Sequence, residues 1–262
     1  MEGPVAGQVA VITGAGQGIG RAIALRLAQD GMDIVAADMR GEQAEAVAVE
    51  VRALGRRALA VAADVTRAED RERMLDAATT GLGRLDVLVN NAATQRAALP
   101  LDVTEEHWDT LMNVNSKAVF FCCQLALRHM AAQRSGRIVN MASIAGKLAS
   151  TIYHPIYNVS KAAVIAMTKT LALAHAADGV RVNAVCPGVV DTPMQDVVDR
   201  EFARITGRAP ADIRAERVGR IPLGRVEQPE EVAAAVSFLV GPDSRYMTGE
   251  ALTVSGGLLA GW

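Results

Sequence analysis

Cysteine, aromatic residues and an excess of charge of either sign are all scarce in this sequence. The 262 residues include three cysteines, and only 3% of them are aromatic. The 27 basic and 29 acidic side chains leave a formal net charge of −2, without the positive field that nucleic-acid-binding domains need. The shortage of aromatic rings also argues against a surface on which nucleic-acid bases stack. The composition therefore predicts no nucleic-acid partner.

Long apolar runs, targeting signals and metal-ligand spacings are missing as well. No 18 apolar residues run together, which predicts no membrane span, and residues 1–4 show neither the basic nor the apolar region of a secretory signal. The four histidines lie far apart, without the spacing of a metal site. Cys122 and Cys123 are adjacent in an apolar stretch, which is typical of buried, reduced thiols. We expect a cytoplasmic protein that binds no metal.

Short apolar runs alternate with amphipathic stretches along the whole chain. The predicted strands are 9–13, 33–38, 58–64, 85–90, 137–142, 181–186 and 251–255. The predicted helices are 20–30, 42–54, 68–80, 107–132, 157–176 and 230–239. Strands that are apolar nearly throughout are typical of a sheet covered on both faces, and strand–helix alternation implies parallel strands with right-handed crossovers. We therefore predict one α/β domain over residues 1–262, a doubly wound, Rossmann-type domain whose seven-stranded parallel sheet has helices on both faces.

One long segment interrupts this alternation. Residues 195–226 are charged, contain scattered proline and glycine, and include no predicted strand. Long irregular segments in compact domains usually serve as lids or binding loops, and this one follows the carboxyl end of a strand, where open α/β sheets bind ligands. We expect a substrate lid around residues 190–226 rather than an insertion without function.

A glycine-rich turn follows the first predicted strand and leads directly into a helix. Its spacing is Gly-x3-Gly-x-Gly, at Gly14, Gly18 and Gly20. Such a turn lets a pyrophosphate approach the backbone and the free N–H groups of the helix. The second strand ends in Asp38, whose carboxylate can bind both ribose hydroxyls of NAD and repels the 2′-phosphate of NADP. The combination predicts dinucleotide binding with a preference for NAD.

A tyrosine and a lysine stand four residues apart at the start of a predicted helix. Tyr157 and Lys161 share one helix face, and an ammonium beside a phenol lowers the phenol pKa from about 10. A tyrosine tuned in this way can exchange a proton with a substrate oxygen. Ser143 closes the fifth predicted strand, where its hydroxyl can either donate to a substrate oxygen or cap a turn.

Taken together, several motifs in order along the chain resemble the short-chain dehydrogenase/reductase family. These motifs are Thr13–Gly20, Asp64–Val65, Asn90–Ala93, Asn115, Ser143, Tyr157-x3-Lys161 and Thr192. The resemblance implies that Tyr157 is the catalytic acid/base and that Ser143 polarises the reacting oxygen. It also implies that Lys161 holds the nicotinamide ribose and that Asn115 keeps a water for proton relay. The cofactor-binding positions that it implies are Gly14, Gln17, Gly18, Ile19, Gly20, Asp38, Asp64, Val65, Asn91, Tyr157, Lys161, Pro187, Val190 and Thr192.

The same resemblance implies a homotetramer, with helix 230–239 and the apolar tail to residue 262 as interface material. Among family members the chain looks most like bacterial dehydrogenases of small polyols, including acetoin, butanediol and sugar-alcohol dehydrogenases. The polar residues expected near the pocket are Thr94, Gln95, Arg96, Lys147, Tyr153 and His154. We therefore predict an NAD-dependent dehydrogenase of a small secondary alcohol or polyol. Two alternatives are an NADPH-dependent 3-oxoacyl-(acyl carrier protein) reductase and a catalytically silent nucleotide-binding regulator.

Overall fold

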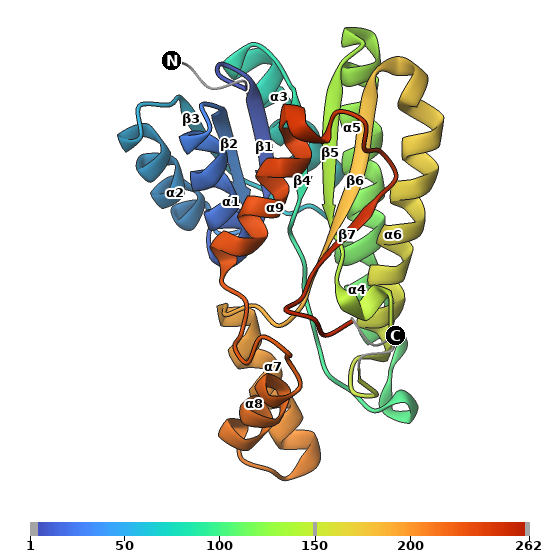
Figure 1. The fold of residues 1–262 in the computed structure, drawn as a ribbon. Coiled ribbons are helices and arrows are strands. Elements are labelled where there is room, and N and C mark those ends of the chain that lie inside the picture. Colours follow the sequence, from blue (N-terminus) through green and yellow to red (C-terminus); the bar gives the residue numbers. More distant parts are fainter. Residues whose placement is uncertain (1–4, 149–150, 260–262) are drawn as a thin grey trace.

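A sheet of seven parallel strands forms the centre of the protein (Figure 1). The computed structural model describes residues 5–148 and 151–259. The strands are β1 Val9–Thr13, β2 Asp33–Asp38, β3 Ala58–Ala62, β4 Val87–Asn90, β5 Gly136–Met141, β6 Val180–Pro187 and β7 Ala251–Val254. Their order across the sheet is β3-β2-β1-β4-β5-β6-β7. All seven predicted strands are present, and the predicted Rossmann-type α/β fold is confirmed.

Helices cover both faces of the sheet, because successive side chains of each strand point to opposite sides. One layer comprises α1 Gly18–Gln29, α2 Gly41–Ala53 and α9 Pro229–Val240. The other comprises α3 Ala68–Asp76, α5 Ala118–Gln133 and α6 Pro155–His175. Within β1, Ala10 and Ile12 pack into the first layer, whereas Val9 and Val11 pack into the second. This explains why the strand sequences are apolar throughout instead of alternating.

The helix predicted over 107–132 is divided by a wider, π-helical turn. It consists of α4 Glu105–Met112, the π turn Asn113–Lys117 and α5, joined end to end. A second π turn, Ala77–Leu82, continues α3. Such turns are uncommon and often lie at functional sites. The short 3₁₀ turns are Pro100–Asp102, Ile144–Gly146, Ala176–Asp178 and Pro242–Ser244.

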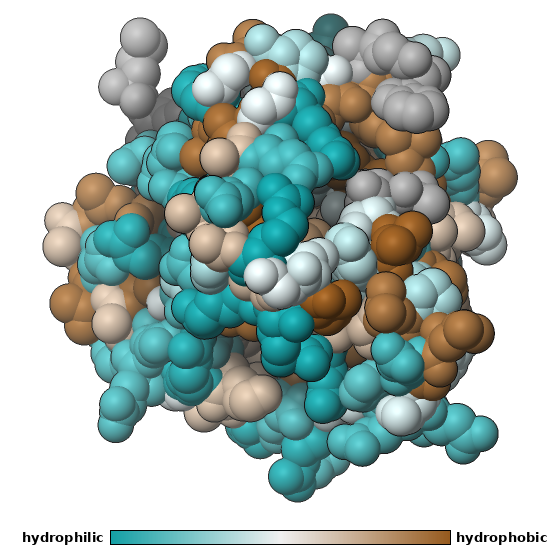
Figure 2. All heavy atoms as spheres, turned by 90° about the horizontal axis from the view of Figure 1, so that it is seen from below, coloured by the Kyte–Doolittle hydropathy of each residue, from teal (hydrophilic) through white to brown (hydrophobic). Residues whose placement is uncertain are grey.

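The segment predicted as a long irregular lid contains two helices instead. These are α7 Pro193–Thr206 and α8 Pro210–Gly219, which extend beyond the carboxyl edge of the sheet (Figure 1). Each begins with proline, whose fixed φ suits the first helical position, and Gly207 ends α7 with φ +70°. Figure 2 views this end of the molecule and shows mostly hydrophilic side chains with apolar ones between them. The helical pair α7–α8 contacts the body where Glu201 accepts a 2.6 Å hydrogen bond from the Ala97 N–H.

From the sequence we expect neither a membrane span nor a metal site. In residues 5–148 and 151–259, no helix combines the length and apolar character needed to cross a membrane. The same residues contain no group of three or more histidine, cysteine or acidic side chains that could hold a metal ion. Cys122, Cys123 and Cys186 are free and buried, as predicted, and burial raises the pKa of Cys122 to about 12. Residues 1–4 and 260–262, where a signal and part of an interface were considered, lie outside the described residues.

Candidate active site

A cavity of about 980 Å3 opens along the carboxyl ends of the strands. It runs from the glycine turn after β1 and the end of β2, past the ends of β5 and β6, to α7 and α8. All fourteen predicted cofactor positions line this cavity, and so does Ser143. Parallel strands bring these residues together because their carboxyl ends meet at one edge of the sheet. Of the predicted site residues, Asn115 alone does not line it.

The glycine turn is held tightly against the end of β4. Gly14 and Gly18 have φ of +63° and +53°, values that favour glycine. A Cβ on Gly20 would lie 2.0 Å from the Gly14 carbonyl oxygen, so this position requires glycine for close approach. The side-chain amide of Asn91 donates to the carbonyls of Thr13 and Gly14, each at 3.0 Å. Asn91 therefore shapes the turn as well as lining the cavity.

Asp38 faces the cavity at the end of β2. Its Oδ2 accepts a hydrogen bond from the Gly16 N–H at 2.9 Å, and its Oδ1 accepts one from the Arg40 N–H at 2.9 Å. The Arg40 Nε lies 3.8 Å from Oδ1, so a cation stands beside the carboxylate. The buried carboxylate can accept further hydrogen bonds from a ribose in the cavity.

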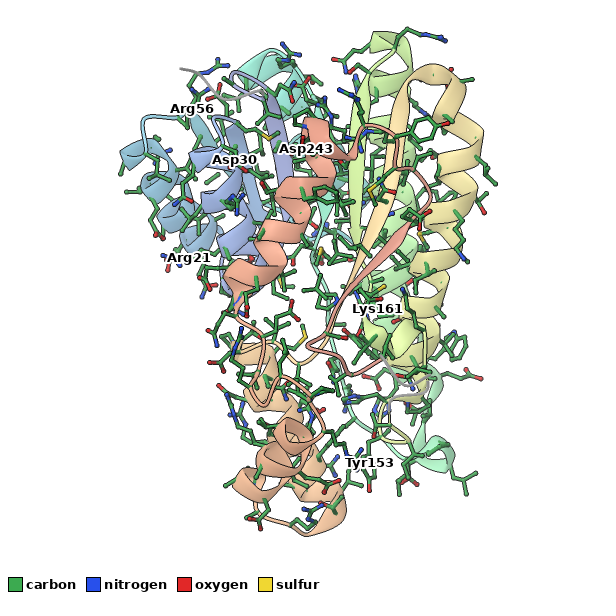
Figure 3. All side chains as sticks on the ribbon, viewed as in Figure 1. Arg21, Asp30, Arg56, Tyr153, Lys161 and Asp243 are labelled. Carbon is green, nitrogen blue, oxygen red and sulfur yellow. The ribbon has the colours of Figure 1, made fainter. Side chains whose placement is uncertain are left out.

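Ser143, Tyr157 and Lys161 share the wall formed by β5 and α6. Ser143 lies two residues beyond Met141, the last residue of β5, and Tyr157 and Lys161 lie on one face of α6. The Lys161 Nζ donates to the Met141 carbonyl at 2.7 Å and lies 5.7 Å from the centre of the Tyr157 ring. Figure 3 shows Lys161 beside the sheet, with Tyr153 further out at the end that carries α7 and α8.

The pKa of Tyr157 differs from the value expected from the sequence. Burial raises the pKa of Tyr157 to about 12, although a hydrogen bond with the Ser143 side chain offsets part of the rise. Burial also lowers the pKa of Lys161 to about 8, against a smaller opposing effect of Cys186. The expectation that Lys161 lowers the pKa of Tyr157 is therefore wrong for these residues. Desolvation of the Tyr157 phenol is the largest cause of its shift, and the charge of Lys161 is not among the causes.

Asn115 acts from behind the cavity wall, on the π turn between α4 and α5. Its Oδ1 accepts from the Thr94 N–H, and its Nδ2 donates to the Thr94 carbonyl, both at 2.9 Å. The same Nδ2 donates to the Ser160 Oγ at 3.2 Å. Thr94 lines the cavity and Ser160 precedes Lys161. Asn115 thus fixes two parts of the wall through its own side chain.

The outer half of the cavity contains residues that the sequence analysis missed. The ring of Phe202 on α7 packs against His154 and Tyr153, with centroid distances of 4.6 and 4.9 Å. Gln95 Nε2 lies 2.9 Å from His154 Nδ1, and Arg217 of α8 also lines the cavity. The helical spacing of buried Val198 and Phe202 was the available signal for α7. Two residues expected near the pocket lie elsewhere: Arg96 lines a neighbouring hollow, and Lys147 bonds to Ala251 and Thr253 of β7.

Comparisons with known proteins agree over nearly the full length. A family model described as enoyl-(acyl carrier protein) reductase matches residues 14–259. The chain is 39% identical over 253 residues to a 3-oxoacyl-[acyl-carrier-protein] reductase of Thermotoga maritima, covering 97% of this chain and 98% of that protein. It is 40% identical to the cis-4-hydroxycyclohexanecarboxylate dehydrogenase of Sinomonas cyclohexanicum, covering 97% of each. A crystal structure of a short-chain type dehydrogenase/reductase from Mycobacterium marinum superimposes with a TM-score of 0.90 at 33% identity, over 97% of this chain and 96% of that one.

Proposed function

Because the chain belongs to the short-chain dehydrogenase/reductase family, we propose that it transfers a hydride reversibly between a small secondary alcohol and NAD. The family membership makes it an oxidoreductase that acts on an alcohol or ketone. The observation that carries the finer proposal is one continuous cavity, with the carboxylate of Asp38 at one end and Tyr157 beside Ser143 further along. A ribose bound to Asp38 and a carbinol bound at Tyr157 and Ser143 would lie in the same cavity.

The residues present fit a dinucleotide. A Cβ on Gly16 would lie 2.9 Å from the Asp38 Oδ2, and one on Gly18 would lie 3.3 Å from Thr192, so the turn keeps open the space that a pyrophosphate needs. The adenosine ribose would bind Asp38, with Asp64 and Val65 beside the adenine. Lys161 would donate to the nicotinamide ribose, since it lines the cavity and its Nζ has N–H groups beyond the one bonded to Met141. When bound, NAD supplies the acceptor for the hydride that leaves the carbinol carbon.

The chain's own groups would handle the proton and the orientation of the substrate. In oxidation, the substrate O–H bond breaks and its proton passes to the deprotonated oxygen of Tyr157, while two electrons leave with the hydride. In reduction, the Tyr157 hydroxyl donates its proton to the carbonyl oxygen. Ser143 would hold that oxygen by a hydrogen bond, and Asn115 would keep the wall in place through Thr94 and Ser160.

The outer cavity favours a ring-bearing substrate within the alcohol class. The family resemblance favours small polyols, and Gln95 with Thr94 could form hydrogen bonds with their hydroxyl groups. The wall made by Tyr153, His154 and Phe202 is largely flat and aromatic, which suits a cyclic secondary alcohol better than an open chain. The named substrate of the Sinomonas relative is such an alcohol. We also propose that the helical pair α7–α8 is the lid over this substrate.

A second candidate is reduction of a 3-oxoacyl thioester with NADPH. The name of the Thermotoga relative favours it, and Arg40 near the end of β2 could meet a 2′-phosphate. The carboxylate of Asp38 on the cavity wall opposes it, because it would repel that phosphate. The silent-regulator alternative is opposed by the presence of Ser143, Tyr157 and Lys161 together.

The test is the absorbance of NADH with purified protein, NAD or NADP, and a panel of cyclic alcohols, diols, sugar alcohols and a 3-hydroxyacyl thioester. We expect turnover with NAD on a secondary alcohol. Tyr157→Phe should lower it by at least ~10²-fold and leave NADH binding nearly intact. Tyr246→Phe is the matched control, because Tyr246 is fully exposed and does not line the cavity. Turnover only with NADP and the thioester would establish the second candidate instead.

We further propose a homotetramer of single-domain subunits that works in the cytoplasm. The family resemblance and the free, buried thiols support this. Trp108 on α4, Leu173 on α6 and Phe238 on α9 are exposed apolar side chains that a subunit interface would cover. Light scattering at micromolar concentration tests the assembly, and a monomeric mass would contradict it.

A further inference from the structure

Arg217 of α8 reaches the outer cavity as a largely buried cation. Its side chain is 24% exposed, and its Nη1 donates to Asp199 Oδ1 at 2.7 Å while Nη2 donates to Gln195 Oε1 at 3.1 Å. These bonds use two of its five N–H groups, and no other partner occurs among residues 5–148 and 151–259. The guanidinium carbon lies 5.7 Å from the centre of the Phe202 ring.

A continuous aromatic wall connects Arg217 with the acid/base residue. The Phe202 ring lies 4.6 Å from the His154 ring, which in turn lies 6.0 Å from the Tyr157 ring, between centroids. Burial, together with the charge of Arg217, lowers the pKa of His154 to about 3. His154 is therefore neutral at physiological pH. The positive charge of Arg217 lies at the far end of this uncharged aromatic wall.

Further arginines of α8 and its flanking residues add positive charge to the part of the cavity where Arg217 lies. Arg208, Arg217 and Arg220 line the cavity together with one acid, Glu216. Glu216 is already bound to Arg208 at 2.6 Å and to Arg220. Asp199 is the counter-ion of Arg217 at 2.7 Å, and the nearby Arg214 is paired with Asp191 at 2.6 Å and with Asp196 at 3.3 Å. The outer cavity can therefore accept an anion.

We propose that Arg217 binds an anionic group of the substrate, so that this enzyme acts on cyclic hydroxy acids. The inference rests on the proposed function and narrows its substrate class. The carbinol lies against Ser143 and Tyr157, the ring packs on His154 and Phe202, and a carboxylate accepts from the free N–H groups of Arg217. A planar guanidinium suits this role because it can donate two parallel hydrogen bonds to a carboxylate.

The alternative role for Arg217 is structural, since its ion pair with Asp199 also joins α8 to α7. A structural role would affect acid and neutral substrates equally. We therefore compare 4-hydroxycyclohexanecarboxylate, as cis and trans isomers, with the corresponding methyl esters, which keep the ring and carbinol but lack the charge. The neutral ester also reports whether each variant is folded and active.

For the unmodified enzyme we expect kcat/KM with NAD to be at least tenfold higher for the acid than for its ester. Arg217→Met should lower kcat/KM for the acid by about 10- to 100-fold, in line with loss of a charged hydrogen bond, and change that of the ester less than threefold. Arg200→Met is the matched control, because Arg200 is an exposed arginine of α7 that does not line the cavity. Equal losses for acid and ester would overturn the proposal.

Binding tests the anion site independently of turnover. Calorimetry with NADH present compares cyclohexanecarboxylate with the neutral cyclohexanecarboxamide. We expect the carboxylate to bind at least tenfold more tightly, and Arg217→Met to abolish the difference. If the two ligands bind equally, the anion site is absent even where alcohols are oxidised. If the carboxylate is preferred but no alcohol reacts with NAD, the site stands and the proposed function fails.

Discussion

The carboxylate of Asp38 and the backbone N–H of Gly16 form a hydrogen bond of 2.9 Å between Oδ2 and the nitrogen. This bond joins the end of β2 to the glycine turn after β1. Asp38 is only 7% exposed, and its other oxygen accepts from the Arg40 N–H. The residue therefore shapes the cofactor end of the cavity and also supplies its negative charge.

These two roles of Asp38 can be separated by substitution. Asp38→Asn keeps an oxygen that can accept from Gly16 but removes the charge, whereas Asp38→Ala removes both. We expect Asn to lower the preference for NAD over NADP by at least ~10-fold, with a small loss of thermal stability because its amide nitrogen cannot accept from the Arg40 N–H. Alanine should relax the preference and also raise the Kd for NAD. The measurement is kcat/KM with each cofactor, and an unchanged preference in both variants would show that Asp38 does not contact the ribose.

The sequence was sufficient to predict the sheet because its inner strands are buried on both faces. Continuous apolar runs mark such strands, and β1 and β2 begin and end where predicted. The helices α7 and α8 were missed because charged side chains are spread through them and only a few apolar side chains, Val198, Phe202 and Ile213, are buried. These three side chains pack with Ala97 and Tyr153 in a small apolar cluster that joins residues far apart in sequence.

Local sequence motifs predict only part of the candidate site, because its other contacts join residues that the fold brings together. Local motifs identify Gly14, Ser143 and Tyr157, since their roles follow from backbone geometry or from neighbours along one helix. The contact of Asn115 with Thr94 joins residues far apart in sequence, so no local pattern indicates it. The pKa of Tyr157 depends on burial, which requires the packed structure.

The raised pKa of Tyr157 predicts opposite pH dependences for the two reaction directions. Below its pKa of about 12 the phenol carries its proton, as ketone reduction requires, whereas alcohol oxidation needs the deprotonated form. We expect kcat/KM for oxidation to rise from pH 7 to pH 10, and kcat/KM for reduction not to rise. Both are measured with saturating cofactor, using the residual rate of Tyr157→Phe as the control. A flat profile for oxidation would contradict the assignment.

Alanine substitutions at Gly20, in the glycine turn, and at Gly219, at the end of α8, form a matched test and control. Gly20→Ala would place a Cβ 2.0 Å from the Gly14 carbonyl oxygen and 2.6 Å from the Asn91 amide nitrogen. We expect it to lower the free energy of unfolding by about 1–3 kcal/mol and to weaken NADH binding. Gly219→Ala, at the end of α8, meets nothing within 4 Å and should leave stability unchanged or raise it by up to ~1 kcal/mol. Thermal melts with and without NADH measure both, and equal effects would contradict the prediction.

Glu227 places a buried carboxylate under the segment that leads from β6 to α7. Its Oε2 accepts from the Gly188 N–H at 3.2 Å, and its Oε1 is buried without a partner in the described structure. Its backbone bonds to Val189 and Asp191, each at 2.8 Å. Burial raises the pKa of Glu227 to about 7, with a smaller contribution from the charge of Glu231. The carboxyl group thus stabilises this segment best when it carries a proton.

That raised pKa predicts a fall in stability between about pH 4.5 and pH 7. In this range the folded chain holds a proton on Glu227 that the unfolded chain has lost, so the free energy of unfolding decreases as pH rises. Glu227→Gln should remove this decrease. Relative to the parent protein, the variant should gain on the order of 3 kcal/mol between pH 4.5 and pH 8. Urea unfolding at both pH values measures the difference, with exposed Glu230→Gln as the control. Parallel pH dependences in parent and Glu227→Gln would show that the pKa of Glu227 is the same in the folded and unfolded chains.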